Sequence, residues 1–345
     1  MGPPLAAARC KRIIRNRRHG GDGRSDPNRR RPAARNSGRP MDIATARSLI
    51  ELNNRFYTRN AASFSATRSA PWAGWRALSE LLAQHGWSNP DDDGTGAAEE
   101  RRVLDLACGN LRFERFLADE FPKLNLRFVA VDSCAELACD TAVRDIDCTY
   151  RQIDVLQALL DCDENTPGSA CPAVVIAPGS TCPAVTITPE SSCPAVFIAP
   201  GNAPAPEAGP TFDLCATFGF MHHVPGEHLR RRLLDRLLDC TSPGGLLAMS
   251  FWQFMSDDRL SRKADQADSA MRAQGRIDMA RLDANDHFLG WQTDPSPLRY
   301  CHHFDEREID ELVASVGTRA REVARYSADG SSGTLNRYLV LERLA

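Results

Sequence analysis

Two short apolar runs that each end in a carboxylate constrain the fold of this chain more than any other feature. Residues 102–110 read Arg-Val-Leu-Asp-Leu-Ala-Cys-Gly-Asn, and a second run, 129–132, ends at Asp132, 22 residues after Asn110. A small-residue turn and a periodic apolar pattern lie between the runs, so the order predicts strand, turn, helix and strand. This order is typical of one nucleotide-binding half of an open α/β sheet.

The glycine content after the first run indicates which nucleotide fits. A dinucleotide needs Gly-x-Gly-x-x-Gly, because backbone amides and a helix N-terminus must hold its pyrophosphate. Residues 107–112 read Ala-Cys-Gly-Asn-Leu-Arg with a single glycine, which disfavours a nicotinamide oxidoreductase. Asp132 falls where such sheets place an acid against two ribose hydroxyls. A ligand with adenosine but no phosphate fits better, and S-adenosylmethionine is the common one.

With the insert near 160–210 excluded, residues 45–343 resemble the class I S-adenosylmethionine-dependent methyltransferases, of the type 11-like kind. Five segments carry the resemblance in order: the family's Asp-x-Gly-x-Gly-x-Gly loop at 105–111, its ribose-binding acid at Asp132, its adenine-side acid at Asp154, its fourth strand at 212–224 and its Pro-Gly-Gly turn at 242–251. The resemblance implies one Rossmann-like α/β domain, in which helices flank a mostly parallel, seven-stranded sheet. It also implies an enzyme that uses S-adenosylmethionine as methyl donor.

The resemblance further implies which residues hold the cofactor. They are Tyr57, Asp105, Ala107, Cys108, Gly109, Asn110, Asp132, Ser133, Asp154, Val155, Phe218 and Gly219. Two glycines of the family's loop are replaced here, by Ala107 and Leu111. The branched Leu111 side chain is expected beside the ligand, where the family keeps bare backbone, and so bears on cofactor affinity. A non-catalytic module that has lost tight cofactor binding is therefore an alternative.

Three segments resemble the tRNA wobble-uridine carboxymethyl methyltransferases more narrowly. Residues 56–72 nearly repeat that family's Phe-Ser-x-Thr-Arg-x-x-x-Trp run, and His222-His223 matches its His-His after strand four. Residues 299–304, Arg-Tyr-Cys-His-His-Phe, are similar to its Arg-Tyr-Tyr-His-Leu-Phe. This resemblance implies methylation of a carboxymethyl uridine in tRNA. A small-molecule O-methyltransferase is the alternative, so the acceptor stays open between tRNA and a small molecule.

Two residues are candidates for the acceptor chemistry. A carboxylate acceptor is already a nucleophile, and Arg68 is the candidate to position it through two hydrogen bonds. His223, expected at the carboxyl edge of strand four, is the candidate base for a hydroxyl acceptor. The alternatives are an arginine paired with an acid and a packed histidine. No Asp/Asn-Pro-Pro-aromatic tetrad follows 215–221, which disfavours methylation of an exocyclic amine.

The charge is distributed unevenly along the chain. The first 40 residues hold 12 Lys/Arg and 2 Asp/Glu, which predicts a disordered basic arm. A nucleic-acid arm, a targeting segment and a translated upstream region all fit, the last with Met41 as the natural start. The predicted methyltransferase domain, 41–345, holds 30 basic and 43 acidic residues, a net charge of −13, which repels a polyanion such as tRNA at long range. Arg230, Arg231 and Arg232 are interpreted as the solvated face of a helix.

The twelve cysteines include no Cys-x-x-Cys pair, and no secretory or membrane-length apolar run accompanies them. Buried thiols in a cytoplasmic monomer, without disulfides, bound metal or membrane contact, are therefore expected. Within the insert, 170–202 repeats a Cys-Pro-Ala-Val unit with a period of 11 residues. Because each unit holds two prolines, a surface excursion is predicted. A metal ladder of Cys171, Cys182 and Cys193 is disfavoured, because the repeat holds no histidine to complete the ligand set.

The periodicity predicts seven helices and seven strands. The helices are expected at 44–60, 74–85, 111–119, 134–142, 226–240, 263–284 and 306–316. The strands are expected at 103–107, 127–132, 149–153, 212–218, 246–252, 298–304 and 337–342. His302 and His303 are expected to be structural residues of a strand, and the segment 254–298 is expected to help cover the substrate pocket.

Overall fold

The computed structural model describes residues 40–87, 100–138, 142–164, 174–176, 195–196, 211–292 and 294–345. Its helices are α1 (Ile43–Ala66), α2 (Ala73–Gln84), α3 (Arg112–Glu120), α4 (Val155–Glu164), α5 (Glu227–Cys240), α6 (Asp258–Gln274) and α7 (Glu306–Ser315). The 3-10 turns are η1 (Ala135–Leu137), η3 (Met221–His223), η4 (Phe254–Ser256) and η5 (Met279–Arg281). None of the described helices combines the length and the apolar character that crossing a membrane requires.

Seven strands form one sheet in the order β10-β11-β7-β6-β1-β2-β3. These strands are β1 (Glu100–Leu106), β2 (Asn125–Asp132), β3 (Asp147–Gln152), β6 (Phe212–Thr217), β7 (Thr241–Trp252), β10 (Ala320–Ala328) and β11 (Asn336–Arg343). The pairs from β3 to β7 are parallel, whereas β11 runs antiparallel to both of its neighbours. The predicted fold class, a Rossmann-like, mostly parallel seven-stranded sheet, is therefore confirmed.

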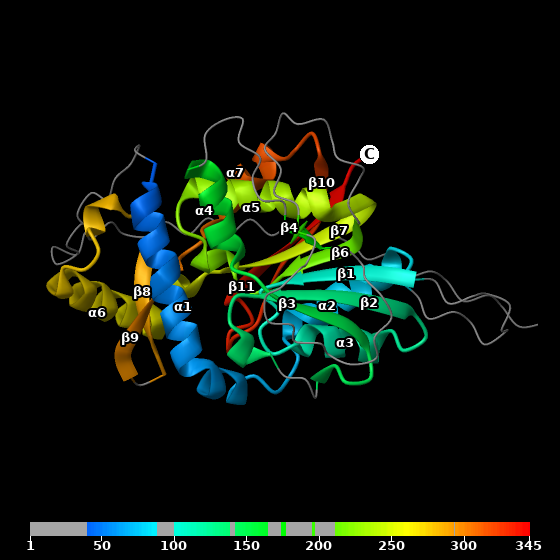
Figure 1. Ribbon diagram of the computed structural model, residues 1–345, viewed down its shortest axis with the longest axis horizontal. Helices are drawn as coiled ribbons and strands as arrows, with labels where there is room; N and C mark the ends of the chain where they lie inside the picture. The colour runs from blue at the N-terminus through cyan, green and yellow to red at the C-terminus, as the bar shows by residue number, and fades with distance from the viewer. Residues whose placement is uncertain are drawn as a thin grey trace, which may run out of the picture. The chain divides into compact units, whose positions relative to one another are not determined.

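Helices cover both faces of this sheet, as Figure 1 shows. On one face, α4, α5 and α7 bury apolar stripes that include Leu159, Leu233 and Ile309. On the other face, α2 and α3 bury Trp75 and Phe116. The leucines of α5 recur every three or four residues, which is the spacing that keeps one helical face on the sheet. Because helices cover both faces of the sheet, a ligand can reach it only at the edge where the parallel strands end.

A second layer of structure lies beside that edge. Strands β8 (Asp286–Trp291) and β9 (Asp294–His302) form a separate antiparallel pair, with α6 against β8 and α1 against β9 (Figure 1). The prediction that 298–304 belongs to the main sheet was therefore wrong, since the seventh strand is β10. The alternation in 298–304 suits either sheet, whereas β10 is a largely solvent-facing edge strand with a weak apolar pattern. Sequence periodicity alone does not separate these two cases.

The helix prediction also differs from the structure in three places. The helix predicted at 263–284 begins earlier, at Asp258, and ends as α6 at Gln274, where Gly275 has a positive φ. The predicted helix at 134–142 is only the 3-10 turn η1 among its described residues, because 139–141 lie outside them. The helix α4 was not predicted. Within the insert, β4 (Val174–Ile176) and β5 (Ala195–Val196) pair antiparallel, and the rest of the repeat and of the basic arm lies outside the described residues. The six cysteines whose thiols are described are free, and five of them are buried.

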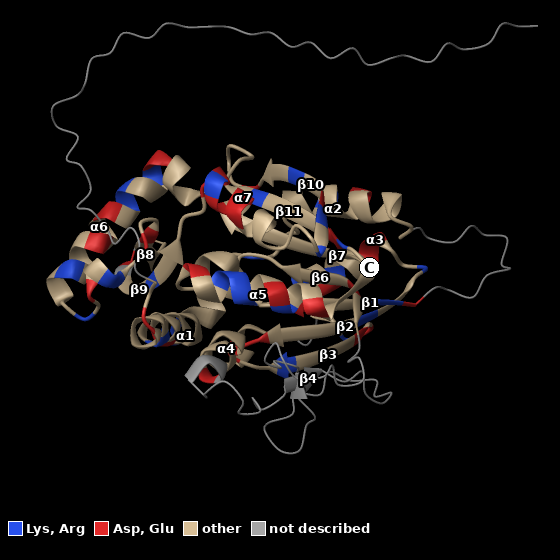
Figure 2. Ribbon diagram, turned by 90° about the horizontal axis from the view of Figure 1, so that it is seen from above, with Lys and Arg blue, Asp and Glu red and all other residues tan. Residues whose placement is uncertain are grey.

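Arg230 is buried, although the sequence predicted a solvated face for it. Its guanidinium pairs with Asp283 at 2.8 Å and with Glu308 at 3.0 Å, and its Nη1 donates to a backbone carbonyl. The side chain of its neighbour Arg231 is partly exposed and pairs with Glu227 one turn away, in agreement with the prediction. Figure 2 shows acidic and basic residues interspersed along α5, α6 and α7. Arg230 therefore joins α5 to α7 and to the chain before β8.

His302 extends this buried charge network. Its Nδ1 lies 2.7 Å from an oxygen of Asp286, and its Nε2 lies 2.6 Å from an oxygen of Glu308. Burial alone would lower the pKa of His302, but the hydrogen bonds to these two carboxylates raise it. The imidazole therefore donates to an acid from each ring nitrogen. This position agrees with the structural role predicted for His302.

Candidate functional site

A cavity of about 620 Å³ lies where β1, β2 and β6 end, and residues of α1 and β9 complete its lining. Every residue predicted for cofactor binding or catalysis lines it: Tyr57, Arg68, Asp105, Ala107, Cys108, Gly109, Asn110, Asp132, Ser133, Asp154, Val155, Phe218, Gly219 and His223. The volume is in the range of small-molecule sites. The structure thus brings the candidates together, and their individual roles stay predictions.

Asp132 ends β2 inside this cavity. One carboxylate oxygen accepts the Gly109 backbone N–H at 2.9 Å, and the other accepts the Cys134 backbone N–H at 2.9 Å. Burial raises the pKa of Asp132, while these backbone hydrogen bonds act in the opposite direction. Each oxygen keeps a second lone pair, so the carboxylate can also accept the two hydroxyls of a ribose. The sequence did not predict that Asp132 also holds the glycine loop.

The loop after β1 makes room for a ligand through left-handed backbone. Ala107, Gly109 and Leu111 all have positive φ, at 62°, 58° and 62°. A Cβ built on Gly109 would meet no atom within 4 Å, so the chain is bare where it borders the cavity. Ala107 and Leu111, which replace glycines of the family's loop, therefore adopt a backbone conformation that favours glycine. The cost of a left-handed non-glycine residue is about 1–2 kcal/mol.

Leu111 does not lie where the sequence suggested. Its side chain is fully buried in the core, with Phe113 and Leu117 of α3 as neighbours in the cluster, and it does not line the cavity. The expectation of a branched side chain beside the ligand was therefore wrong. Because this expectation was the reason for the non-catalytic alternative, that alternative loses its support.

Asp154 has a structural function in addition to its place in the cavity. One oxygen accepts the Gln157 backbone N–H at 2.9 Å and caps α4, and the other accepts the Asn54 side-chain N–H at 2.6 Å. A capping acid is typical of a helix start. Because α4 was not predicted, this function was missed. Asn54 of α1 also lines the cavity and was missed.

Behind the loop, Asp105 lies against a second buried acid, Glu114 of α3, which the sequence analysis missed. Glu114 is fully buried among Phe113 and Phe116. Burial and the adjacent Glu114 hold the pKa of Asp105 well above its usual range. Burial likewise raises the pKa of Glu114 to about 7. Two carboxyl groups this close do not both ionise readily, so the pair retains a proton near neutral pH.

Replacing Glu114 with glutamine is expected to stabilise the protein at pH 8 and to flatten its stability profile. Since the folded pKa of about 7 exceeds the ordinary 4.5, the folded state binds more protons between these values, and stability falls as pH rises through them. The shift corresponds to about 3 kcal/mol. Urea unfolding between pH 5 and 8 measures it, with exposed Asp119→Asn on the same helix as control. A wild-type slope retained in Glu114→Gln would contradict the assignment.

His223 is held by hydrogen bonds at both ring nitrogens. Its Nδ1 lies 2.9 Å from the Tyr300 carbonyl oxygen and 3.2 Å from the Asn53 amide nitrogen. The contact to the carbonyl is shorter and its oxygen only accepts, so we assign the proton to Nδ1, and the Asn53 N–H₂ donates to the same carbonyl. The Nε2 of His223 therefore accepts from the Tyr57 hydroxyl at 2.7 Å. Burial lowers the pKa of His223 to about 3 and raises that of Tyr57 to about 12. His223 is thus a neutral, poorly basic group, and it positions the Tyr57 hydroxyl.

Arg68 lies just after the end of α1. Its side chain is half-buried and lines the cavity. Its guanidinium stacks 3.3 Å from the centre of the Phe64 ring, and its Nη1 donates to the Thr67 hydroxyl at 3.2 Å. Burial lowers its pKa to about 10. Within the described residues it forms no ion pair with an acid, so the alternative of an acid-paired arginine is wrong there. A cation in this position is available to an anionic ligand.

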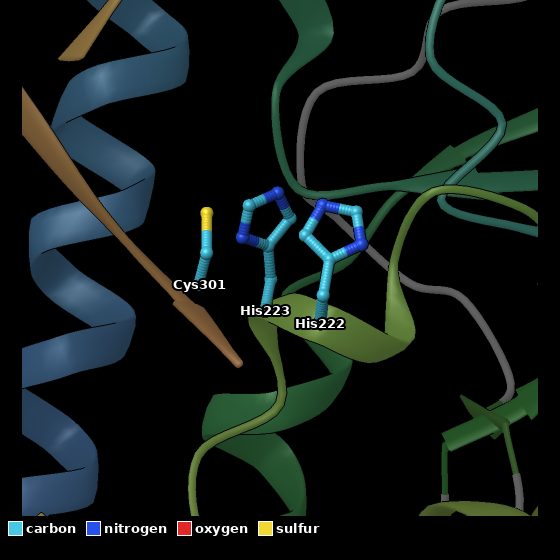
Figure 3. Close-up of side chains that lie close together, drawn as sticks. All are labelled: His222, His223 and Cys301. Carbon is cyan, nitrogen blue, oxygen red and sulfur yellow. The ribbon is translucent and has the colours of Figure 1, made fainter. Parts of the chain in front are cut away.

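His222 and His223 project side by side from η3, and Cys301 of β9 approaches them, as Figure 3 shows. Their possible ligand atoms all lie within 4.8 Å of one another. Both nitrogens of His223 are already hydrogen-bonded, burial raises the pKa of the Cys301 thiol to about 11, and the Arg299 guanidinium stands beside the thiol. A neutral thiol and an adjacent cation oppose metal binding. We therefore assign no metal to this cluster.

No protein-family model matches this chain, and no curated protein matches it. Among solved structures, it is similar to the 1,6-didemethyltoxoflavin-N1-methyltransferase of Burkholderia thailandensis, with 13% identity, a TM-score of 0.47 and coverage of 89% of this chain and 94% of the other. The magnesium protoporphyrin IX methyltransferase of Synechocystis PCC 6803 gives 10% identity, a TM-score of 0.41 and coverage of 86% and 95%. An S-adenosylmethionine-dependent methyltransferase of Methanosarcina mazei gives 13% identity, a TM-score of 0.41 and coverage of 72% of this chain and 94% of the other.

Proposed function

We propose that this chain is an S-adenosylmethionine-dependent methyltransferase that acts on an oxygen atom of an anionic acceptor. The observation that carries the proposal is Asp132, a buried carboxylate at the end of β2 that accepts the Gly109 backbone N–H and, together with the bare backbone of Gly109, lines a cavity of about 620 Å³. This is the arrangement that a ribose diol needs, beside a loop with room for the rest of the nucleoside. The acids Asp105, Asp132 and Asp154 border that part of the cavity.

The acceptor part of the cavity has the opposite charge. Arg68 and Arg299 line it without an acidic partner among the described residues, together with the neutral His222 and His223. A hydroxyl acceptor would need a base, and the low pKa of His223 makes it a weak one. A carboxylate acceptor needs none. S-adenosylmethionine, when bound, would supply an electrophilic methyl group on sulfur. A carboxylate held by Arg68 would accept this methyl group through an oxygen lone pair, the C–S bonding pair would remain on sulfur, and no proton would need to be removed.

The molecule that bears this carboxylate is either a tRNA with a carboxymethyl uridine or a small molecule. The net charge of −13 over residues 41–345 opposes long-range attraction of a polyanion. Purified protein with labelled donor, incubated separately with bulk tRNA and with a fraction of small acids, distinguishes the two. A base-labile methyl ester is the expected product in either case. Label in an alkali-stable ether or amine would contradict a carboxylate acceptor.

Substitution of Arg68 is expected to reduce turnover more than substitution of His223. Arg68→Lys should fail like Arg68→Ala, because an ammonium does not reproduce a planar two-point contact. His223→Ala should retain more activity, because an ionised carboxylate requires no proton removal. Turnover of each variant at saturating donor measures this ranking, and cofactor affinity by calorimetry is the control. An inactive His223→Ala with an active Arg68→Ala would instead indicate a hydroxyl acceptor.

A further inference from the structure

Arg299 is the most unusual charged residue of the cavity. It lies on β9, is only 7% exposed, and its Nε and Nη1 have no hydrogen-bond partner among the described residues. Its guanidinium stands 4.8 Å from the Phe56 ring, 5.6 Å from Trp291 and 5.8 Å from Trp252. Arg230, the other fully buried arginine, pairs with two acids. Burying a charge without a partner is costly, so the Arg299 guanidinium lacks a hydrogen-bond acceptor that a ligand could supply.

The strand geometry directs Arg299 toward the ligand. Side chains alternate along β9, so Leu298, Tyr300 and His302 share one face, which packs into the core and the charge network. Arg299 and Cys301 share the other face, and Cys301 reaches the histidines that line the cavity (Figure 3). Arg299 itself lines the cavity. Its unpartnered nitrogens therefore belong to the binding site.

Arg68, two residues after the end of α1, lies near one of the same rings. The guanidinium of Arg68 lies 5.6 Å from the Trp291 ring centre, the same distance as that of Arg299. Arg299 also contributes to the lowered pKa of Arg68, after burial, which is the larger cause. The two cations repel each other, and no acidic side chain of the described residues lies between them. A bound anion would therefore stabilise the pair. Since guanidinium groups bind a carboxylate in two-point geometry, a carboxylate is the anion that this pair suits.

The walls around the two arginines indicate what carries the carboxylate. Tyr57, Phe64 and Trp252 line this part of the cavity, and their flat surfaces favour a planar, apolar group. We propose that Arg299 and Arg68 together bind the carboxylate of a small aromatic carboxylic acid, and that Arg299 determines the specificity for the anion. This rests on the proposed function, because the bound acid is the methyl acceptor. Arg299 is thus a positioning residue that the sequence analysis did not assign.

Binding of phenylacetate tests the proposal without turnover. Calorimetry is carried out on the full chain with S-adenosylhomocysteine present, and phenylacetamide serves as the uncharged analogue. We expect phenylacetate to bind and phenylacetamide to bind much more weakly. We expect Arg299→Met to weaken phenylacetate binding at least about tenfold, the loss of one charge-assisted contact. The exposed Arg307→Met is the matched control, and its affinity for phenylacetate should equal that of the wild type.

Thermal stability distinguishes a binding role from a structural one. An unpartnered buried charge is a liability in the ligand-free protein, so Arg299→Met should melt at the same temperature as the wild type or higher. A lower melting temperature, or phenylacetate affinity equal to the wild type, would overturn the proposal. Equal binding of phenylacetate and phenylacetamide, or binding of bulk tRNA alone, would do so too. If phenylacetate binds but S-adenosylhomocysteine does not, the anion site stands and the methyltransferase function fails.

Discussion

Replacing Arg230 with methionine is expected to destabilise the folded protein by about 3–5 kcal/mol, although the residue touches no ligand site. Methionine fills much of the same space but leaves Asp283 and Glu308 without the cation that faces both. Asp286 and the protonated His302 belong to the same network, so the loss is not confined to one pair. Equilibrium unfolding in urea at pH 7 measures the change in the free energy of unfolding.

Arg231→Met is the matched control for this experiment. Arg231 is the adjacent residue of α5, is 40% exposed, and pairs with Glu227 on the same helix. Exposed pairs of this kind contribute little, so a change below about 0.5 kcal/mol is expected. If both variants lose the same small amount, Arg230 does not hold the network together in solution. A triple variant that also replaces Asp283 and Glu308 with neutral residues should recover part of the loss.

Arg230 also shows where sequence reasoning ends. On α5 the leucines mark one face, and Arg230 lies next to that face, where a long side chain normally reaches solvent. Its partners come from chain segments more than fifty residues away, at Asp283 and Glu308. No local pattern records such a contact. The same applies to Glu114, whose place inside the apolar stripe of α3 was a signal that the sequence analysis did not use.

The cavity, in contrast, was largely predictable. Parallel strands bring their carboxyl ends to one edge, so residues directly after β1, β2 and β6 must meet once the strands are identified. Asp132 and Gly109 followed from this rule. The acceptor side depends on how α1 and β9 fold over the edge, and the sequence assigned 298–304 to the wrong sheet. In the sequence, Arg299 is recognisable only as the first residue of the motif at 299–304. Its position in the cavity is visible only in the structure.

Replacing Asp132 with asparagine is expected to weaken binding of S-adenosylmethionine at least about 100-fold. The carboxylate is the proposed acceptor for two ribose hydroxyls, and each charge-assisted hydrogen bond contributes about 1.5–3 kcal/mol. Asparagine keeps the size of the side chain but presents an amide N–H₂ to one of two backbone donors, Gly109 N–H or Cys134 N–H. The loop that borders the cofactor therefore loses a contact together with the ribose. Calorimetric titration with S-adenosylmethionine measures the dissociation constant.

Asp213→Asn separates the two causes of this loss. Asp213 on β6 also accepts a backbone N–H, from Arg102 at 2.8 Å, but it does not line the cavity. Its replacement removes a comparable strand contact and should leave cofactor affinity within about twofold of the wild type, because affinity depends on the groups that touch the ligand. A folded Asp132→Asn protein with wild-type affinity would refute the cofactor assignment. Equal losses in both variants would show that affinity follows the stability of the sheet and does not depend on the Asp132 carboxylate.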